Sequence, residues 1–186
     1  MRRQVVIDAC CTLNLLATRR ELEIVGGLGL HLLDAPQVRG EILTLWTPPD
    51  ADGQRTKETT STKPLRDAGH LETRPLDADA LVDAFVAAAA RIKDADASCI
   101  ALAGVMGLPL MTDERKERRI ARDPFPAIEL VSALDLLAEA KDRLGWSSTD
   151  LATVASDLRW RGNFAPPRHD PRGAWYESLL IGRGAM

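Results

Sequence analysis

The chain has 186 residues, of which 45% are hydrophobic and 27% charged, a composition ordinary for one soluble globular domain. Its net charge of -3 excludes any argument for a nucleic-acid partner from overall charge, so an electrostatic footprint would have to be local. No segment approaches the roughly 18 uninterrupted apolar residues of a membrane span, and Asp8 interrupts the apolar run near the N-terminus, which is unlike a signal peptide.

In the first half of the chain, short apolar runs alternate with helical patterns. The runs predict strands at residues 4–7, 30–33 and 71–74. Helices are expected at residues 11–20 and 20–28. Asp34 can cap a third helix, with Pro36 in its first turn, where proline is tolerated. The residues expected on this third helix include Val38, Glu41, Ile42 and Leu45.

The composition changes between Thr47 and Ala68. This segment contains Pro48-Pro49, Asp52-Gly53 and a polar run from Thr56 to Lys63. Because such a segment has little apolar surface to bury, it predicts an exposed loop or a partly disordered insertion at residues 47–68.

The second half of the chain continues the alternation. Strands are predicted at residues 108–112 and 128–131, and helices at residues 80–92, 96–106 and 114–122. Two further helices begin with a serine followed three residues later by an aspartate, the pattern of a capping box. These pairs are Ser132 with Asp135 and Ser147 with Asp150.

Five short strands alternating with helices predict an α/β protein with a three-layer α/β/α architecture and a parallel sheet. Residues 1–131 are expected to form the core, and residues 132–186 a C-terminal extension of helices and a tail packed on it. In such sheets, ligands bind beyond the carboxyl ends of the strands, near the point where strand order reverses.

Four acidic residues are candidates for a site at those strand ends. Asp8 and Asp113 each follow a predicted strand, Asp96 lies at the start of an apolar helix, and Glu41 lies within the third helix. Each has a structural explanation: a turn residue, a helix N-cap (Asp94 or Asp96), or a solvated face for Glu41. Together they favour a site, because Asp8 and Asp113 would reach the same rim of the sheet.

Carboxylates gathered at close range repel one another unless a cation neutralises them. Hard oxygen ligands suit Mg2+ or Mn2+, which can activate a water and stabilise charge on a phosphoryl group. The sequence therefore indicates a metal site whose natural substrate is a phosphodiester.

A basic helix follows Asp113. Its cations, interrupted only by Glu117, are Arg115, Lys116, Arg118, Arg119 and Arg122. They could hold phosphates near the metal and position a nucleic acid without reading its sequence. The alternative is a solvated helix with pairs such as Glu114–Arg118.

Four segments together resemble the PIN-domain family, which includes VapC-type toxins. The first is Val5-Val6-Ile7-Asp8, followed by a helix with Leu13-Asn14-Leu15. The second is Val38-Arg39-Gly40-Glu41-Ile42. The third is the segment from Lys93 to Ala103, similar to an Asp-Gly-Glu-Ala stretch that leads into an Ile-Ala-Leu-Ala helix. The fourth is the segment from Leu110 to Lys116, similar to Thr-Asp-Asp-Arg-Lys.

The resemblance, from Val5 to about Val131, implies Mg2+- or Mn2+-dependent cleavage of single-stranded RNA, as in the toxin of a toxin–antitoxin pair. It implies catalytic roles for Asp8, Glu41, Asp96 and Asp113, and metal ligation by Asp8, Asp96 and Asp113. Substrate contacts are expected from Asn14, Thr112, Arg115 and Lys116. The implied partners, besides RNA, are an antitoxin protein and a second copy of the chain.

Other functions remain open from the sequence alone. A PIN-like module that binds RNA or protein without catalysis would need no cluster of repelling carboxylates, and a small-molecule phosphatase would act on phosphomonoesters. Cys10, Cys11 and Cys99 lie in apolar stretches and are expected to be reduced and buried, as in a cytoplasmic protein. No local signature supports a cysteine nucleophile.

Overall fold

A five-stranded parallel sheet organises the chain. The computed structural model describes residues 2–41, 44–168 and 170–181. The strands are β1 (Arg3–Ile7), β2 (Leu30–Asp34), β5 (Leu71–Thr73), β6 (Leu110–Met111) and β7 (Leu130–Val131). Their order is β5-β2-β1-β6-β7, with every pair parallel. All five predicted strands are confirmed.

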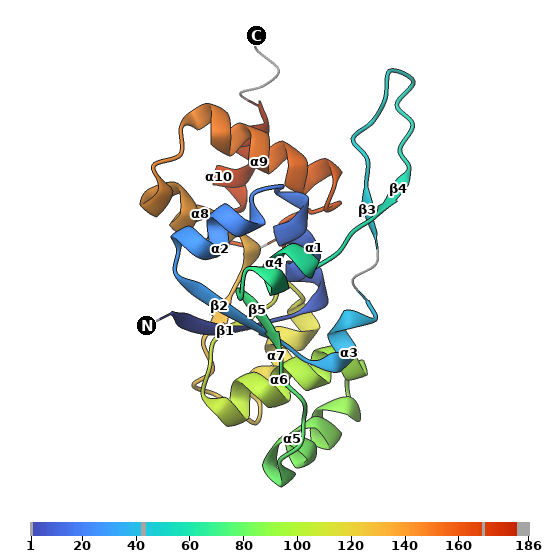
Figure 1. The fold of residues 1–186 in the computed structure, drawn as a ribbon, viewed down its shortest axis with the longest axis vertical. Coiled ribbons are helices and arrows are strands. Elements are labelled where there is room, and N and C mark those ends of the chain that lie inside the picture. Colours follow the sequence, from blue (N-terminus) through green and yellow to red (C-terminus); the bar gives the residue numbers. More distant parts are fainter. Residues whose placement is uncertain (1, 42–43, 169, 182–186) are drawn as a thin grey trace.

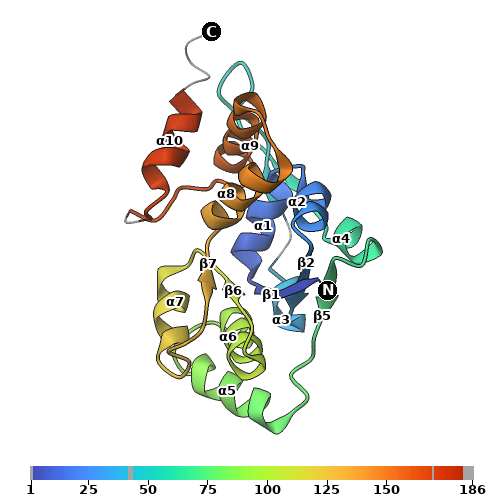
Figure 2. The ribbon, with the colours of Figure 1, turned by 90° about the vertical axis from the view of Figure 1, so that its left-hand side faces the viewer.

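Helices cover both faces of this sheet (Figures 1 and 2). One face carries α1 (Ala9–Ala17), α2 (Glu21–Gly27) and α8 (Ala133–Leu144), with α9 (Ser148–Trp160) and α10 (Gly173–Ile181) outside them. The other face carries α5 (Asp79–Ala89), α6 (Asp94–Met106) and α7 (Arg115–Arg122). Because parallel strands are buried on both faces, β1 can be a continuous apolar run, and Val5, Val6 and Ile7 are all buried. The predicted three-layer α/β/α fold with C-terminal helices is confirmed.

Strand order reverses beside β1. From β1, the chain adds β2 and β5 on one side, and then returns to add β6 and β7 on the other. Val6 lies opposite Leu33 of β2 and opposite Leu110 of β6. The connections therefore diverge at the carboxyl ends of β1 and β6, which is where open α/β sheets leave a crevice for ligands.

Local capping signals fix the ends of several helices. Ser132 and Ser147 each form the predicted capping box, with Asp135 and Asp150 respectively. The tail after α9 returns to the core through Tyr176, which is fully buried and whose hydroxyl donates to the carbonyl of Ala155 at 3.0 Å. Among the described residues, no helix combines the length and apolar character needed to cross a membrane.

The helix predicted after Asp34 is wrong beyond its first turn. Helix α3 (Pro36–Arg39) ends at Gly40, and Glu41 lies in the turn that follows. Ile42 lies outside the described residues. Asp34 does not cap α3, because its carboxylate accepts a hydrogen bond from Arg66 at 2.5 Å.

The segment predicted as a loop forms a β-hairpin followed by a helix. Strands β3 (Thr44–Trp46) and β4 (Lys57–Thr59) pair antiparallel, so Leu45 is in a strand rather than in the predicted helix. Helix α4 (Lys63–Asp67) then leads to β5. Figure 1 shows the hairpin extending from the body of the protein.

The hairpin is attached to the end of α9. The backbone N–H of Trp46 donates to the carbonyl of Arg161 at 2.9 Å. The Arg55 guanidinium lies 5.0 Å from the Trp46 ring centre and 5.7 Å from that of Trp160, and it also donates to the Trp160 carbonyl. The contacts with Trp160 and Arg161 join residues more than 100 positions apart in the sequence, which explains why local composition predicted only a loop.

Candidate active site

Asp8 occupies the centre of the strand-order reversal. It follows β1 directly, caps α1 and is only 2% exposed. Its Oδ1 accepts a hydrogen bond from the backbone N–H of Cys11 at 2.5 Å. Burial raises the pKa of Asp8 to about 6, and the nearby charge of Asp113 contributes in the same direction, while the Cys11 hydrogen bond opposes both.

Asp113 follows β6 and reaches the same rim. Its carboxylate accepts three hydrogen bonds, from the Ala133 N–H at 3.0 Å, the Asn14 amide at 3.2 Å and the Cys11 thiol at 3.4 Å. Burial raises its pKa, although these donors act against the shift. The predicted meeting of Asp8 and Asp113 is therefore present, and the Asp113 carboxylate is held in one orientation by α1 and by the start of α8.

A further acid, Glu117, lies at the centre of the site, although its place in the sequence indicates only an interruption of a basic helix. It is fully buried, and its Oε2 accepts a hydrogen bond from the Thr112 hydroxyl at 2.6 Å. Burial, followed by the charge of Asp8, raises its pKa well above the usual range. The sequence signal for the burial of Glu117 is helical spacing, because Glu117 lies on the same face of α7 as the buried Ile120 and Ala121.

Asp96 joins this group from the first turn of α6. Burial raises its pKa, and the charges of Glu114 and Glu41 add to the effect, so all three carboxylates lie within electrostatic reach. Asp96 does not cap α6, since Lys93 occupies that position and both Asp94 and Asp96 lie in the first turn. Asp96 and Glu41 thus approach the site, but Glu41 does so from an exposed turn rather than from the predicted helix.

The residues expected to bind substrate divide into two kinds. Arg115 and Lys116 are exposed at the start of α7, as a phosphate contact requires. Asn14 and Thr112 instead support the acids. Asn14 orients Asp113, and Thr112 is fully buried with its hydroxyl committed to Glu117. Other side chains cover the Thr112 hydroxyl in this structure, and the expected contact between Thr112 and substrate stays a prediction.

Arg118 also differs from the expected role of the basic helix. Its guanidinium donates to the backbone carbonyl of Thr112 at 2.7 Å and to those of Leu130 and Val131 at 3.4 Å. These bonds tie α7 to the ends of β6 and β7.

An open groove of about 500 Å³ lies beside Asp113. One wall comes from α1 and the start of α7, and the other from the segment after α9. The lining residues are Cys10, Leu13, Asn14, Asp113, Glu114, Arg115, Gly162, Asn163, Phe164, Ala165, Pro167 and Arg168. Glycine is required at 162 because a Cβ there would lie only 3.0 Å from the Asn14 Oδ1. The volume of the groove falls in the range of small-molecule binding sites.

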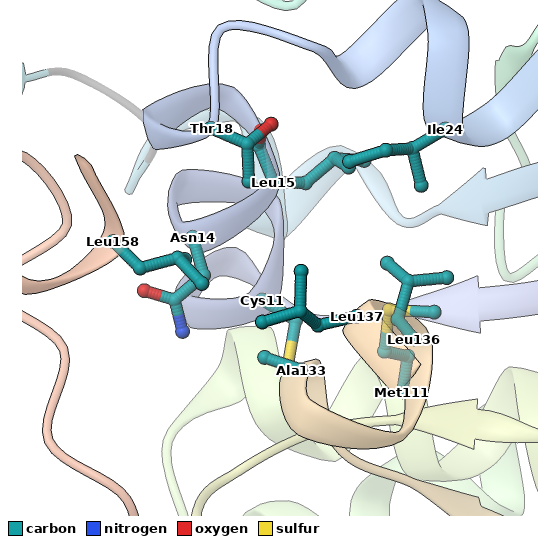
Figure 3. Close-up of a pocket in the computed structure, with 10 residues that line it drawn as sticks. All are labelled: Cys11, Asn14, Leu15, Thr18, Ile24, Met111, Ala133, Leu136, Leu137 and Leu158. Carbon is teal, nitrogen blue, oxygen red and sulfur yellow. The ribbon is translucent and has the colours of Figure 1, made fainter. Parts of the chain in front are cut away.

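A second, much smaller cavity lies behind Asn14 and is shown in Figure 3. Its volume is about 20 Å³, and its walls are mostly aliphatic side chains from α1, α2, α8 and α9. Such a space holds about one water molecule. We therefore place substrate in the groove beside Asp113.

The cysteines do not supply a nucleophile. Cys11 and Cys99 are buried as expected, but Cys10 is exposed, which corrects the prediction that all three are buried. Desolvation and neighbouring carboxylates raise the pKa of Cys10 to about 12, and burial raises the pKa values of Cys11 and Cys99 well above the usual thiol value. All three are therefore protonated near neutral pH, and a thiol is a poor nucleophile.

The donor set fits a hard divalent cation. Every candidate ligand is a carboxylate, and the Oε1 of Glu117 is buried with no hydrogen-bond partner among the described residues. Within those same residues, no three acid, histidine or cysteine side chains already stand at ligand separation. Binding would therefore draw the acids together.

Comparison with protein families, with curated proteins and with solved structures found no match for this chain.

Proposed function

We propose that this protein is a Mg2+- or Mn2+-dependent nuclease of the PIN type that hydrolyses phosphodiester bonds of single-stranded RNA. One observation carries the proposal: the acids that follow β1 and β6 gather with the buried Glu117 of α7 at the strand-order reversal, beside an open groove that also contains Arg115 and Arg168. Buried carboxylates that raise one another's pKa are unfavourable without a function that uses them.

The side chains divide the chemistry between them. Asp8, Asp96 and Asp113 would hold the cation, and Glu41 lies close enough to Asp96 to assist. A bound Mg2+ or Mn2+ supplies an activated water and stabilises negative charge on the phosphoryl group. Asn14 and the Ala133 N–H keep the Asp113 carboxylate oriented, while Arg115 and Arg168 bind phosphates along the groove.

The substrate class and partners follow from the resemblance. It favours single-stranded RNA over other phosphodiesters, and it suggests a toxin controlled by an antitoxin protein or active as a homodimer. These finer assignments are part of the proposal. A cytoplasmic location agrees with three reduced cysteines.

The test compares two aspartates of one helix turn. Asp96 is half-buried at the site, whereas Asp94, two residues earlier, is exposed. With labelled single-stranded RNA and Mn2+, Asp96→Asn should lower the cleavage rate by about 100-fold, because a metal-site carboxylate is lost. Asp94→Asn should cleave like the wild type, and EDTA should stop both. Equal rates for the two variants would contradict the proposed site.

Substitution of Arg168 tests RNA binding in the groove separately from cleavage. Arg168→Ala should weaken RNA binding and reduce the slope of log affinity against log salt by about one, because one phosphate contact is lost. The control is Arg91→Ala, which removes an exposed arginine paired with Asp123 on the opposite face of the sheet. Binding would be followed by fluorescence anisotropy at several salt concentrations. An unchanged slope for Arg168→Ala would show that Arg168 makes no phosphate contact and that the RNA does not bind along this wall of the groove.

A binding module without catalysis is the second candidate. It is favoured by the absence of a ready-made set of metal ligands among the described residues. Titration with Mn2+ separates the two functions: no binding at millimolar concentrations would support the module, whereas binding with metal-dependent cleavage supports the nuclease.

A further inference from the structure

Glu117 is a buried charge without a counter-charge. Helix α7 is otherwise basic on its exposed side, yet this one acid points into the protein and is fully buried. The nearest arginine in sequence, Arg118, donates to backbone carbonyls of Thr112, Leu130 and Val131 instead. No ion pair to Glu117 occurs within residues 2–41, 44–168 and 170–181. Because burying an unpaired carboxylate is costly, the burial of Glu117 indicates that a binding partner offsets this cost.

The carboxylate is oriented rather than loosely enclosed. The Thr112 hydroxyl holds Oε2 at 2.6 Å, which leaves the buried Oε1 without a hydrogen-bond partner in the described part of the chain. Asp8 is a close neighbour, because its charge helps to raise the pKa of Glu117. The Oδ1 of Asp8 is itself fixed by the Cys11 N–H. Two carboxylates from different elements are thus each anchored through one oxygen.

Two ionised carboxylates cannot donate to each other, so this pair needs either a proton or a cation between its members. We infer that Glu117 is a cation ligand that forms, with Asp8, the inner pair of the metal site. The inference rests on the proposed metal-dependent function and adds an acid outside the four that the family resemblance implies. It also gives Thr112 a role, since its hydroxyl orients the Glu117 ligand.

Metal affinity provides the test, independent of cleavage. Mn2+ binding to the full chain would be measured by calorimetry and by the electron paramagnetic resonance signal of free Mn2+. Glu117→Gln should weaken Mn2+ binding by about tenfold or more. Glu129→Gln is the matched control, because it removes an exposed negative charge directly before β7, at the opposite end of that strand from the acids. It should change affinity by no more than about threefold, as expected for long-range attraction alone.

Stability without metal gives a second readout. In EDTA at pH 8, Glu117→Gln should melt at the wild-type temperature or above, because an amide replaces a buried acid and can donate to Asp8. Its rise in Tm on adding Mn2+ should be much smaller than that of the wild type. If Glu117→Gln does not fold, Glu117→Asp, which keeps the charge but withdraws the oxygens by one methylene, should still show weakened binding.

The outcomes separate this inference from the proposed function. Unchanged Mn2+ affinity in Glu117→Gln or Glu117→Asp, with metal-dependent cleavage in the wild type, would overturn only the role of Glu117. Weakened Mn2+ binding in these variants, with no RNA cleavage by the wild type, would support that role and reject the nuclease. A wild-type protein that binds no Mn2+ would overturn both.

Discussion

Asp8→Asn should abolish RNA cleavage, with a rate about 1,000-fold below that of the wild type, while leaving the fold intact. Asparagine is a good N-cap, so its side-chain oxygen can still accept from the Cys11 N–H at the start of α1. The substitution removes only the charge of a carboxylate at the centre of the proposed metal site, where several kcal/mol of transition-state stabilisation originate. Initial rates at saturating Mn2+ would measure the loss.

Asp8→Ala is the companion variant. It loses the same charge and also the cap, so it should be about 1 kcal/mol less stable than Asp8→Asn. A comparison of their unfolding curves would separate the catalytic role of Asp8 from its structural one. If Asp8→Asn cleaves at the wild-type rate, the acid cluster is not the catalytic centre.

The metal-free protein should be less stable at pH 8 than at pH 5. Folding raises the pKa of Asp8 from 3.8 to about 6, so between these values the folded state binds more protons than the unfolded state. The free energy of unfolding therefore falls as pH rises through this window. For Asp8 alone the fall across the whole window is about 3 kcal/mol, of which about half lies between pH 5 and pH 8. Asp96, Asp113 and Glu117 have raised pKa values too and act in the same direction.

Urea unfolding in EDTA at the two pH values would measure this difference. His70 acts in the opposite direction, because burial lowers its pKa and it loses its proton more readily when folded. Asp8→Asn should reduce the difference between pH 5 and pH 8, and saturating Mn2+ should reverse it by stabilising the ionised carboxylates. A wild-type protein that is more stable at pH 8 in EDTA would show that the acids are not mutually destabilising.

The fold class could be predicted because its signals are local. The apolar run of β1 and the serine–aspartate capping boxes of α8 and α9 depend on residues within one or two turns of one another. The same holds for Asp8 and Asp113, since each directly follows a strand and parallel strands share one carboxyl rim. The prediction of a longer third helix failed because α3 ends at Gly40 after one turn, and Thr44–Trp46 pair with β4 instead.

The hairpin and the groove could not be predicted in this way. Arg55 is held between Trp46 and Trp160, and Gly162 packs against Asn14, so the contacts that place these segments cross most of the chain. Composition alone gives the polarity of a segment but not the surface that it covers. The wall containing Arg168 therefore emerged only from the packing of α9 on α1.

The sequence by itself determined a parallel α/β sheet with Asp8 and Asp113 at its carboxyl rim, because the periodicity and the ends of strands depend on neighbouring residues. Only the tertiary structure decided that Thr112 serves Glu117, that Glu41 approaches from a turn, and that the segment after α9 borders the groove. Burial of Glu117 was decided there as well, because the desolvation of a charge depends on every element that packs around it.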